Sequence, residues 1–392
     1  MTALTATTER HRTDSALPRA ELVRVQTALS IADEWRALEA NADASFFISW
    51  SWIGSWLSMA LEAGVEIYLY RCTQNAQTIA LGLLSRTRVT RHRIFRRTVL
   101  ALNEIPQKGL DMIIEYNDLL IQRGDEQNVR ARFAEDLRAA PVRWDELQLS
   151  GLPEASWQSI AGGSPKLNAI VDETRTPWAT DIREINGDID KLLAPLSRNR
   201  RWQIRRSIKA FQEDGELTTE VPATVEQALA HFDDMGRLHT ARWNSVGKAG
   251  SFANPNWVAF HRAVIREGFA RDEIQLLKIS AGDNVMGYVY SFIWRGTAYM
   301  LQTGFAQEDD NTRRSGIVSH CLAMQYNSTH GVNTYDYMCG DAEYKRTLGA
   351  EGAPLVWGRH QLPRLTLRVE QLALRLRGTA ESMATEKPNS KE

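Results

Sequence analysis

The stretch from Ala298 to Arg346 constrains the fold more than any other part of the chain. It opens with the run AYMLQTGF and later contains VNTYDYM, and both runs have the aromatic, β-favouring composition of strands. Between them, apolar residues recur at helical spacing from Ile317 to Leu322, and Gly331 stands where such a helix would end. The pattern predicts a strand, a loop, a helix and a second strand in succession.

Two cations and a glycine mark the start of the helix in this unit. They belong to the run Arg313, Arg314, Ser315 and Gly316. Free backbone N–H groups and the positive end of the helix dipole suit such a place to an anion, for example a pyrophosphate. A solvated loop with an ordinary helix start would explain the same residues without a ligand.

Composition places the chain among soluble globular proteins and gives it no strong electric field. Of its 392 residues, 43% are hydrophobic and 24% charged, and the formal net charge is −1. This balance does not favour nucleic acid or an acidic membrane as a partner. Cys72, Cys321 and Cys339 show neither a disulfide framework nor a metal spacing, so we expect no metal and a reducing compartment.

Hydropathy adds an expectation about location. The first 18 residues lack the apolar core of a signal peptide, and no apolar run approaches the roughly 20 residues of a membrane helix. We therefore expect a cytoplasmic protein without an integral membrane segment. Residues 1–18 and 378–392 have the polar composition of disordered tails.

Between the tails, the chain divides into two halves of similar order. GGSP at 162–165 reads as a linker, which predicts domains at 19–163 and 164–377. Each half shows a helix, a strand, a short polar turn, two further strands, a helix and a strand, so we infer an internal duplication. The expected elements are a helix at 45–61, strands at 66–72, 78–85, 94–102 and 118–121, a helix at 126–140, strands at 145–152 and 178–185, helices after Ser197 and Thr224 and around 257–265, and a meander at 274–279, 285–294 and 298–305.

The two halves differ at the helix start where the second half carries Arg313 to Gly316. The first half carries Gly124, Asp125 and Glu126 there, and carboxylates at a helix start satisfy the dipole themselves and repel phosphate. The second half is therefore the catalytic candidate. The first is expected to be a scaffold or a wall of the acceptor site.

Several stretches of the second half resemble one family when they are taken in order. They are LSRNRRWQIRRSIKAFQEDG, LHTARWNSVGKAGSFANPNWVAFH, the meander ending in GF, the Arg-Ser-Gly helix start and YDYMCGDAEYK. Together they resemble the acetyltransferases associated with bacterial cellulose and exopolysaccharide synthesis (CelD-like), a branch of the GNAT superfamily. That branch is related to the Fem-type transferases, which also carry two GNAT-like halves.

The resemblance implies an α/β (α+β) fold with tandem GNAT-like domains, each a twisted, mixed and largely antiparallel sheet flanked by helices. It also implies acetyl-CoA or another acyl-CoA as donor, with direct attack of an amine or hydroxyl on the thioester. Arg313, Arg314, Ser315 and Gly316 would then hold the pyrophosphate. Two positions depart from the pattern: Ser315 stands where many relatives have proline, and Val318 replaces the second small residue of the ordinary phosphate loop.

Polar residues after the last strand are candidates for the chemistry. A GNAT reaction needs a base for the nucleophile and often an acid for the departing thiolate. Asp341 is the first candidate base, Tyr344 the acid, and Lys345 a cation that grips a charged acceptor; Asp336, within the strand, is a second candidate base. A polar turn with a packed tyrosine and a structural aspartate would explain the same four residues.

A third group closes the helix before the loop NSVGKAG. Trp243 could stack on a sugar ring and Arg242 could hold a carboxylate or phosphate, with His239 beside them. A core tryptophan beside a satisfied histidine is an equally good explanation. The helix after Ser197 also bears six cations, which could attract an acidic glycan, a nucleotide sugar or an anionic membrane but which usually form only a solvated face: Arg198, Arg200, Arg201, Arg205, Arg206 and Lys209.

Three functional classes remain open at this point. The first is an acyl-CoA-dependent acyltransferase acting on a sugar, nucleotide sugar or other small polar acceptor. The second is a Fem-like transferase that takes its donor from aminoacyl-tRNA, and the third is a non-catalytic subunit of an envelope-polysaccharide assembly. The cationic helix start favours the first class, and no recognised nucleic-acid module accompanies the cations. The sequence does not fix the oligomeric state.

Overall fold

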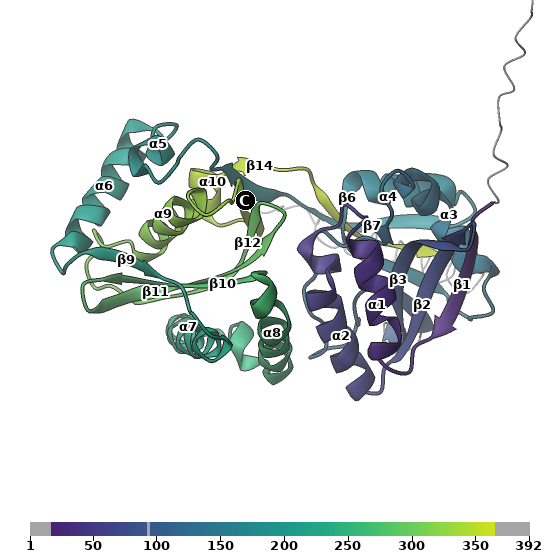
Figure 1. Cartoon of the computed structure of the whole chain (residues 1–392). Coiled ribbons are helices and arrows are strands. Elements are labelled where there is room, and N and C mark those ends of the chain that lie inside the picture. Colours follow the sequence, from purple (N-terminus) through teal and green to yellow (C-terminus); the bar gives the residue numbers. More distant parts are fainter. Residues whose placement is uncertain (1–16, 92–94, 365–392) are drawn as a thin grey trace, which may run out of the picture.

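A computed structural model of the chain describes residues 17–91 and 95–364. Apart from residues 17 and 18, the expected tails at 1–18 and 378–392 lie outside this range. The fold is α/β, with two mixed sheets that lie beside each other and are flanked by helices (Figure 1). None of the described helices is both long and apolar enough to span a bilayer.

The first sheet has the strand order β1-β2-β3-β4-β6-β15-β7, with β5 paired to β3. Only β4 and β6 are parallel; every other pair of this sheet is antiparallel. The strands are β1 (Arg19–Arg24), β2 (Glu66–Gln74), β3 (Gln77–Arg91), β4 (Phe95–Leu102), β5 (Leu120–Ile121), β6 (Glu146–Pro153), β7 (Asn168–Arg175) and β15 (Leu355–Gln361).

The second sheet repeats this plan in the order β9-β10-β11-β12-β13-β8-β14. Here β12 and β13 form the parallel pair, and the expected meander of β10, β11 and β12 is confirmed. The strands are β8 (Pro177–Asp181), β9 (Leu217–Glu220), β10 (Ile274–Ala281), β11 (Asn284–Trp294), β12 (Thr297–Phe305), β13 (Thr334–Cys339) and β14 (Ala350–Glu351).

Helices cover both faces of each sheet. In the first half they are α1 (Leu29–Glu39), η1 (Phe46–Ile48), α2 (Trp50–Glu62), α3 (Glu126–Ala139) and α4 (Glu154–Gly163). In the second they are α5 (Ile189–Leu193), α6 (Arg198–Gln212), α7 (Val225–Ser245), η2 (Ser251–Ala253), α8 (Pro255–Gly268), η3 (Phe269–Arg271), α9 (Ser315–Ser328) and α10 (Glu343–Leu348). The predicted N-caps hold, since the hydroxyls of Ser197 and Thr224 accept from backbone N–H groups of the first turn.

The two sheets exchange a strand with each other. β7 ends at Arg175 in the first sheet, and the chain crosses at once to form β8 between β13 and β14 of the second sheet. After β14 the chain crosses back to the first sheet (Figure 1). There β15 pairs with β6 on one side and with β7 on the other. The first sheet therefore includes two strands from 164–377, the range expected for the second domain.

One apolar core lies between the two sheets and belongs to both halves. It joins α1 and α2 of the first half to α7 and α8 of the second. Within it, the rings of Phe46 and Phe292 stack with their centroids 4.1 Å apart. Alternate residues of the strands face two further cores, one under α6 and α9 and one under α3 and α4. The halves are thus held by burial as well as by the strand exchange.

The predicted linker at 162–165 is wrong. Gly162 and Gly163 end α4, which packs against α3. A Cβ on Gly163 would lie 1.8 Å from the carbonyl oxygen of Ala131, so this glycine permits a close helix contact. The sequence signal was a small residue needed for packing, which resembles a linker when it is read locally.

Candidate active site

The parallel strands of the second sheet separate soon after they meet. β12 pairs with β13 only from Thr297 to Tyr299, which face Thr334 to Asp336, and the two strands then diverge. The loop that follows β12 leads to the start of α9, and the turn that follows β13 leads to α10. Backbone groups on the inner edges of such a splay are free to bind a ligand.

The first sheet has the same splay, but its own chain fills it. β4 and β6 pair from Val99 to Ala101, and beyond that point the side-chain nitrogen of Asn117 donates to the carbonyls of Leu102 and Ser150, at 2.9 and 3.0 Å. Asn117 thereby bridges the two strands. Its side-chain oxygen accepts from Asn103 at 2.9 Å.

Backbone packing closes the first splay further. Gly151 in β6 has φ +68°, and a Cβ there would lie 2.4 Å from the carbonyl oxygen of Ile114. In the second sheet, no described side chain makes hydrogen bonds to both β12 and β13 beyond their pairing. The second splay thus has no counterpart of the Asn117 bridge among the described residues, although Glu115 and Lys345 bind backbone groups at the end of β13.

At the start of α9, the cations differ in role. The guanidinium of Arg313 pairs with Asp214 and donates to the carbonyl of Ala210 at 3.0 Å, so it anchors the loop to the end of α6. The Arg313 side chain is half-buried by these contacts, whereas Arg314 is exposed. The backbone N–H of Arg314 donates to the hydroxyl of Ser207 at 2.9 Å.

Small side chains keep the first turn of α9 open. The hydroxyl of Ser315 donates to the carbonyl of Ala306 at 3.0 Å, which fixes the loop behind the helix. A Cβ on Gly316 would lie 3.2 Å from the ring of Phe305, so glycine lets this ring pack on the helix backbone. The residues present fit a pyrophosphate at this helix start.

Asp336 lies at the apex of the splay, beside the last parallel pair, and is only 7% exposed. The hydroxyl of Tyr116, from the first half, donates to its carboxylate at 2.5 Å, and the N–H of Met338 donates at 2.6 Å. Burial raises the pKa of Asp336 to about 6, although these two hydrogen bonds favour its ionised form. Its protonation therefore changes near neutral pH.

A second carboxylate of the first half reaches the end of β13. Glu115 accepts from the N–H of Cys339 at 2.8 Å, and burial raises its pKa. Lys345 is buried beside it and donates to the carbonyls of Cys339 and Met338, at 2.6 and 3.4 Å, while burial lowers the pKa of its amine. Lys345 thus braces the end of β13 and, in this geometry, does not reach out to grip an acceptor.

The other two expected catalytic residues have different environments. Asp341 has a side chain that is 86% exposed and pairs with Arg346. Tyr344 lies on α10, a short helix where only a turn was predicted. Its ring stacks on the imidazole of His320, with the ring centroids 4.5 Å apart. Burial raises the pKa of the Tyr344 phenol, while Arg242 acts in the opposite direction. Tyr344 is thus half-buried and packed on His320, whereas Asp341 lies at the surface.

The expected acceptor-binding group lies at the end of β12. His239 is buried, contacts the carbonyl of Thr303 at 3.3 Å and accepts from the N–H of Ser251 at 3.3 Å. Burial lowers its pKa, and both of its ring nitrogens have partners within the chain. Trp243 is half-buried against His239 and Lys248, and Arg242 remains exposed.

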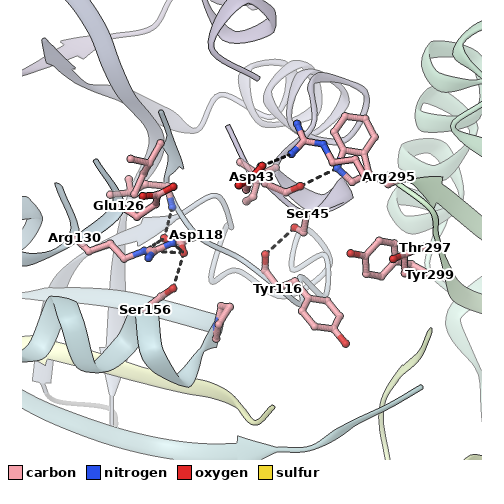
Figure 2. Close-up of a pocket in the computed structure, with 16 residues that line it drawn as sticks. Asp43, Ser45, Tyr116, Asp118, Glu126, Arg130, Ser156, Arg295, Thr297 and Tyr299 are labelled. Atoms are coloured by element: carbon pink, nitrogen blue, oxygen red, sulfur yellow. Dashed lines mark hydrogen bonds and ion pairs between the residues drawn. The ribbon is translucent and has the colours of Figure 1, made fainter. Parts of the chain in front are cut away.

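A cavity of about 480 Å³ lies between the halves, next to the tyrosines that flank Asp336 (Figure 2). Tyr116 and Tyr299 form one side of it, with ring centroids 5.6 Å apart. On the other side, Asp118 is paired with Arg130. Polar, aromatic and aliphatic side chains line this space, and both halves contribute to it.

From the sequence, the first half was expected to be a scaffold or a wall of the acceptor site, but the residues that it contributes were not identified. Glu115 and Tyr116 stand in a segment that was predicted only as a loop, and Tyr299 was assigned to a strand without a role. Tyr116 has a positive φ of +54°, which marks an unusual backbone position in the structure but cannot be read from the sequence. Their proximity to Asp336 depends on packing between the halves.

Comparison with known proteins agrees with this geometry. Residues 198–346 match the family described as "Acetyltransferase (GNAT) domain". No curated protein matches the chain. The fold is similar to that of FemX, with a TM-score of 0.57, 9% identity and coverage of 90% of this chain and 99% of that one.

Two further solved structures share the fold at similar coverage. The C-terminal domain of a putative lysylphosphatidylglycerol synthetase from Agrobacterium fabrum gives a TM-score of 0.50 and 10% identity, over 89% of this chain and 96% of that one. L-PGS from Bacillus licheniformis gives a TM-score of 0.50 and 9% identity, over 87% of this chain and 95% of that one. Residues 198–346 thus form an acetyltransferase (GNAT) domain, and the protein is an acyltransferase.

Proposed function

We propose that the protein transfers an acyl group from acyl-CoA, with acetyl-CoA as the first candidate, to an amine or hydroxyl of a sugar-like acceptor. The observation that carries the proposal is the open splay between β12 and β13, set against the splay of the first half that Asn117 closes. The donor supplies a thioester carbonyl. Its pantetheine arm would lie in the open splay and its pyrophosphate at the start of α9.

Asp336 is the better base on this geometry. It stands at the apex of the splay, and its pKa of about 6 lies near the pH at which a general base is most effective. Asp341 is exposed to water, which gives its carboxylate no comparable environment. Asp336 would accept the proton of the attacking amine or hydroxyl while the new bond to the acyl carbon forms.

Tyr344 is the proposed acid for the sulfur that leaves when the thioester bond breaks. Burial raises the pKa of its phenol, so the hydroxyl carries its proton at neutral pH. A proton donated to the thiolate would complete the transfer and release free CoA. Stacking on His320 fixes the ring for this role.

The cavity between the halves is the proposed acceptor site. Tyr116 and Tyr299 line it and also flank Asp336, so a bound acceptor would approach the base from this side. Aromatic rings together with carboxylates and hydroxyls suit a polyhydroxylated ring. Among its acidic members, Asp43 pairs with Arg123 and Arg295, and Asp118 pairs with Arg130. Glu126 makes no ion pair in the described part of the chain, and its carboxylate favours an acceptor that carries an amine.

Calorimetric titration of the full chain tests the donor. We expect acetyl-CoA and free CoA to bind, and acetyl-CoA at 100 times its dissociation constant to stabilise the fold by about 2.7 kcal/mol. Loss of acetyl-CoA in the presence of amino sugars, followed by the thiol that is released, then tests the transfer.

Other outcomes would favour the remaining classes. Binding of an aminoacyl-tRNA without binding of any CoA species would point to a tRNA-dependent transferase. CoA binding without turnover on any sugar, nucleotide sugar or polysaccharide would favour a non-catalytic subunit. Either result would contradict the proposed reaction.

A further inference from the structure

A stripe of four side chains runs along the outer side of α6. Arg198, Trp202, Arg206 and Lys209 follow one another at intervals of four, four and three residues, which places them on one side of a helix. Trp202 is 57% exposed, unusual for a tryptophan with no described apolar partner above it. The guanidinium carbon of Arg206 lies 5.3 Å from the centre of its ring.

The cations of this stripe differ from the other cations of α6 in their partners. Arg200 pairs with Glu343, Arg205 pairs with Asp190, and Arg201 donates to the carbonyls of Ala194 and Leu196. Those three cations have structural partners. By contrast, the stripe members Arg198, Arg206 and Lys209 make no ion pair with any carboxylate in the described part of the chain.

The stripe lies next to the proposed phosphate site. Gln203 and Ser207, one position further along α6 than Trp202 and Arg206, contact Arg314 at the start of α9, at 3.2 and 2.9 Å. One position along a helix is a rotation of about 100°. A ligand held at the start of α9 would therefore need to pass over only the edge of α6 to reach Trp202 and Arg206.

We propose that Trp202 and Arg206 bind the 3′-phosphoadenosine end of acyl-CoA. Trp202 stacks on the adenine ring, and Arg206 forms a charge-assisted pair with the 3′-phosphate. An exposed aromatic face beside unpaired cations matches a nucleotide better than a plain polyanion, which offers no ring to stack. The inference rests on the proposed function, since it extends the same cofactor site.

This assignment also explains the position of Arg313. Its guanidinium is held by Asp214 and is not free for the cofactor. The loop therefore supplies one exposed arginine, Arg314, and α6 supplies the further positive charge.

The test compares three donors on the full chain by calorimetry: acetyl-CoA, 3′-dephospho-acetyl-CoA and acetyl-pantetheine. We expect the parent protein to bind acetyl-CoA about 10- to 100-fold more tightly than its dephospho form, the range of a charge-assisted hydrogen bond. Arg206→Gln should abolish that preference and leave the affinity for the dephospho form unchanged. Trp202→Ala should weaken both nucleotide donors equally, by about 5- to 100-fold, and leave acetyl-pantetheine unaffected.

Arg138→Gln, a change to a surface arginine on α3 of the first half, is the matched control and should alter none of these affinities. Equal affinity of the parent protein for acetyl-CoA and its dephospho form would overturn the inference, as would a preserved preference in Arg206→Gln. Both results would leave acyl-CoA binding itself intact. If none of the three donors binds, the proposed function fails and the inference fails with it.

Discussion

The two halves of this protein share one topology and differ in what fills the gap between their parallel strands. In the first sheet, Asn117 bridges β4 and β6, and the carbonyl of Ile114 lies close against Gly151. In the second, β12 and β13 part beyond Tyr299 and Asp336 without such a bridge among the described residues. The same topology thus contains one splay that its own chain fills and one that no described side chain bridges.

The segment that fills the first splay also contributes to the candidate active site. The segment that closes the first splay continues through Glu115 and Tyr116, whose side chains reach Cys339 and Asp336 of the second half. The same loop therefore fills one splay and positions the candidate base of the other. The proposed cofactor site therefore belongs to the second half alone, whereas both halves contribute residues to the proposed catalytic site.

The largest expected effect is the loss of stability when β15, which the second half contributes to the first sheet, is removed. Deleting residues 352–392 removes β15, which pairs with both β6 and β7 and buries Leu355 and Val356. We expect this chain to lose cooperative thermal unfolding, since the loss approaches the total stability of a domain, about 5–15 kcal/mol. A chain that ends at Arg364 is the control and should melt like the parent; equal melting of the two shortened chains would contradict the account.

The closed splay predicts the next effect. Asn117→Ala leaves the carbonyls of Leu102 and Ser150 without their partner in a buried place, which should cost about 2–3 kcal/mol in unfolding free energy. The affinity for acetyl-CoA should not change. Asn41→Ala, which removes one exposed amide, should stay within about 0.5 kcal/mol of the parent in urea unfolding. If Asn117→Ala weakened acetyl-CoA binding, the first splay would have to be part of the site.

The two arginines at α9 sharpen the comparison further. Arg314→Ala should weaken acetyl-CoA binding about tenfold, because an exposed cation near the phosphates is lost, and should leave the melting temperature unchanged. Arg313→Ala should lower the melting temperature, because Asp214 and the carbonyl of Ala210 lose their partner. Calorimetric titration and a thermal melt of both variants separate these roles, and a reversed result would show that Arg313 is the phosphate ligand.

The smallest effect concerns pH. As a base, Asp336 must be ionised, so turnover should fall as the pH falls through about 6. Tyr116→Phe removes a hydrogen bond that favours the ionised carboxylate, so the pKa should rise and the midpoint should move up by about one pH unit. An unchanged midpoint, measured from kcat across pH 5–8, would argue against Asp336 as the base. Because the fold raises the pKa of Asp336 from 3.8 to about 6, its carboxyl should also lower stability as the pH rises from 3.8 to about 6, with no further change above that.

The sequence predicted α6 to α9 and β10 to β13 because their signals are local, whereas α5, β9, α10 and β14 were not predicted. Apolar periodicity defined the meander, the caps at Ser197 and Thr224 began α6 and α7, and Gly331 followed α9. These features depend on neighbours within a few residues. The loop at 313–316 could be placed at a helix start for the same reason.

Contacts between distant segments could not be predicted in this way. Nothing local in β15 states that it joins the first sheet, because its partners, β6 and β7, are about 180–210 residues away in the chain. The role of Arg313 depends on Asp214, and that of Lys345 on the carbonyls at the end of β13. A charged side chain in a sequence does not show whether its partner is a ligand or the protein itself.

Amide hydrogen exchange with and without acetyl-CoA tests the central claim most directly, because it reports on both splays in one experiment. We predict that acetyl-CoA slows exchange at residues 300–306, at 314–318 and at 337–340, and leaves 102–104, 114–118 and 149–151 unchanged. Protection confined to the second splay would support the assignment of the cofactor to that half. Protection of the first splay with no change in the second would contradict it.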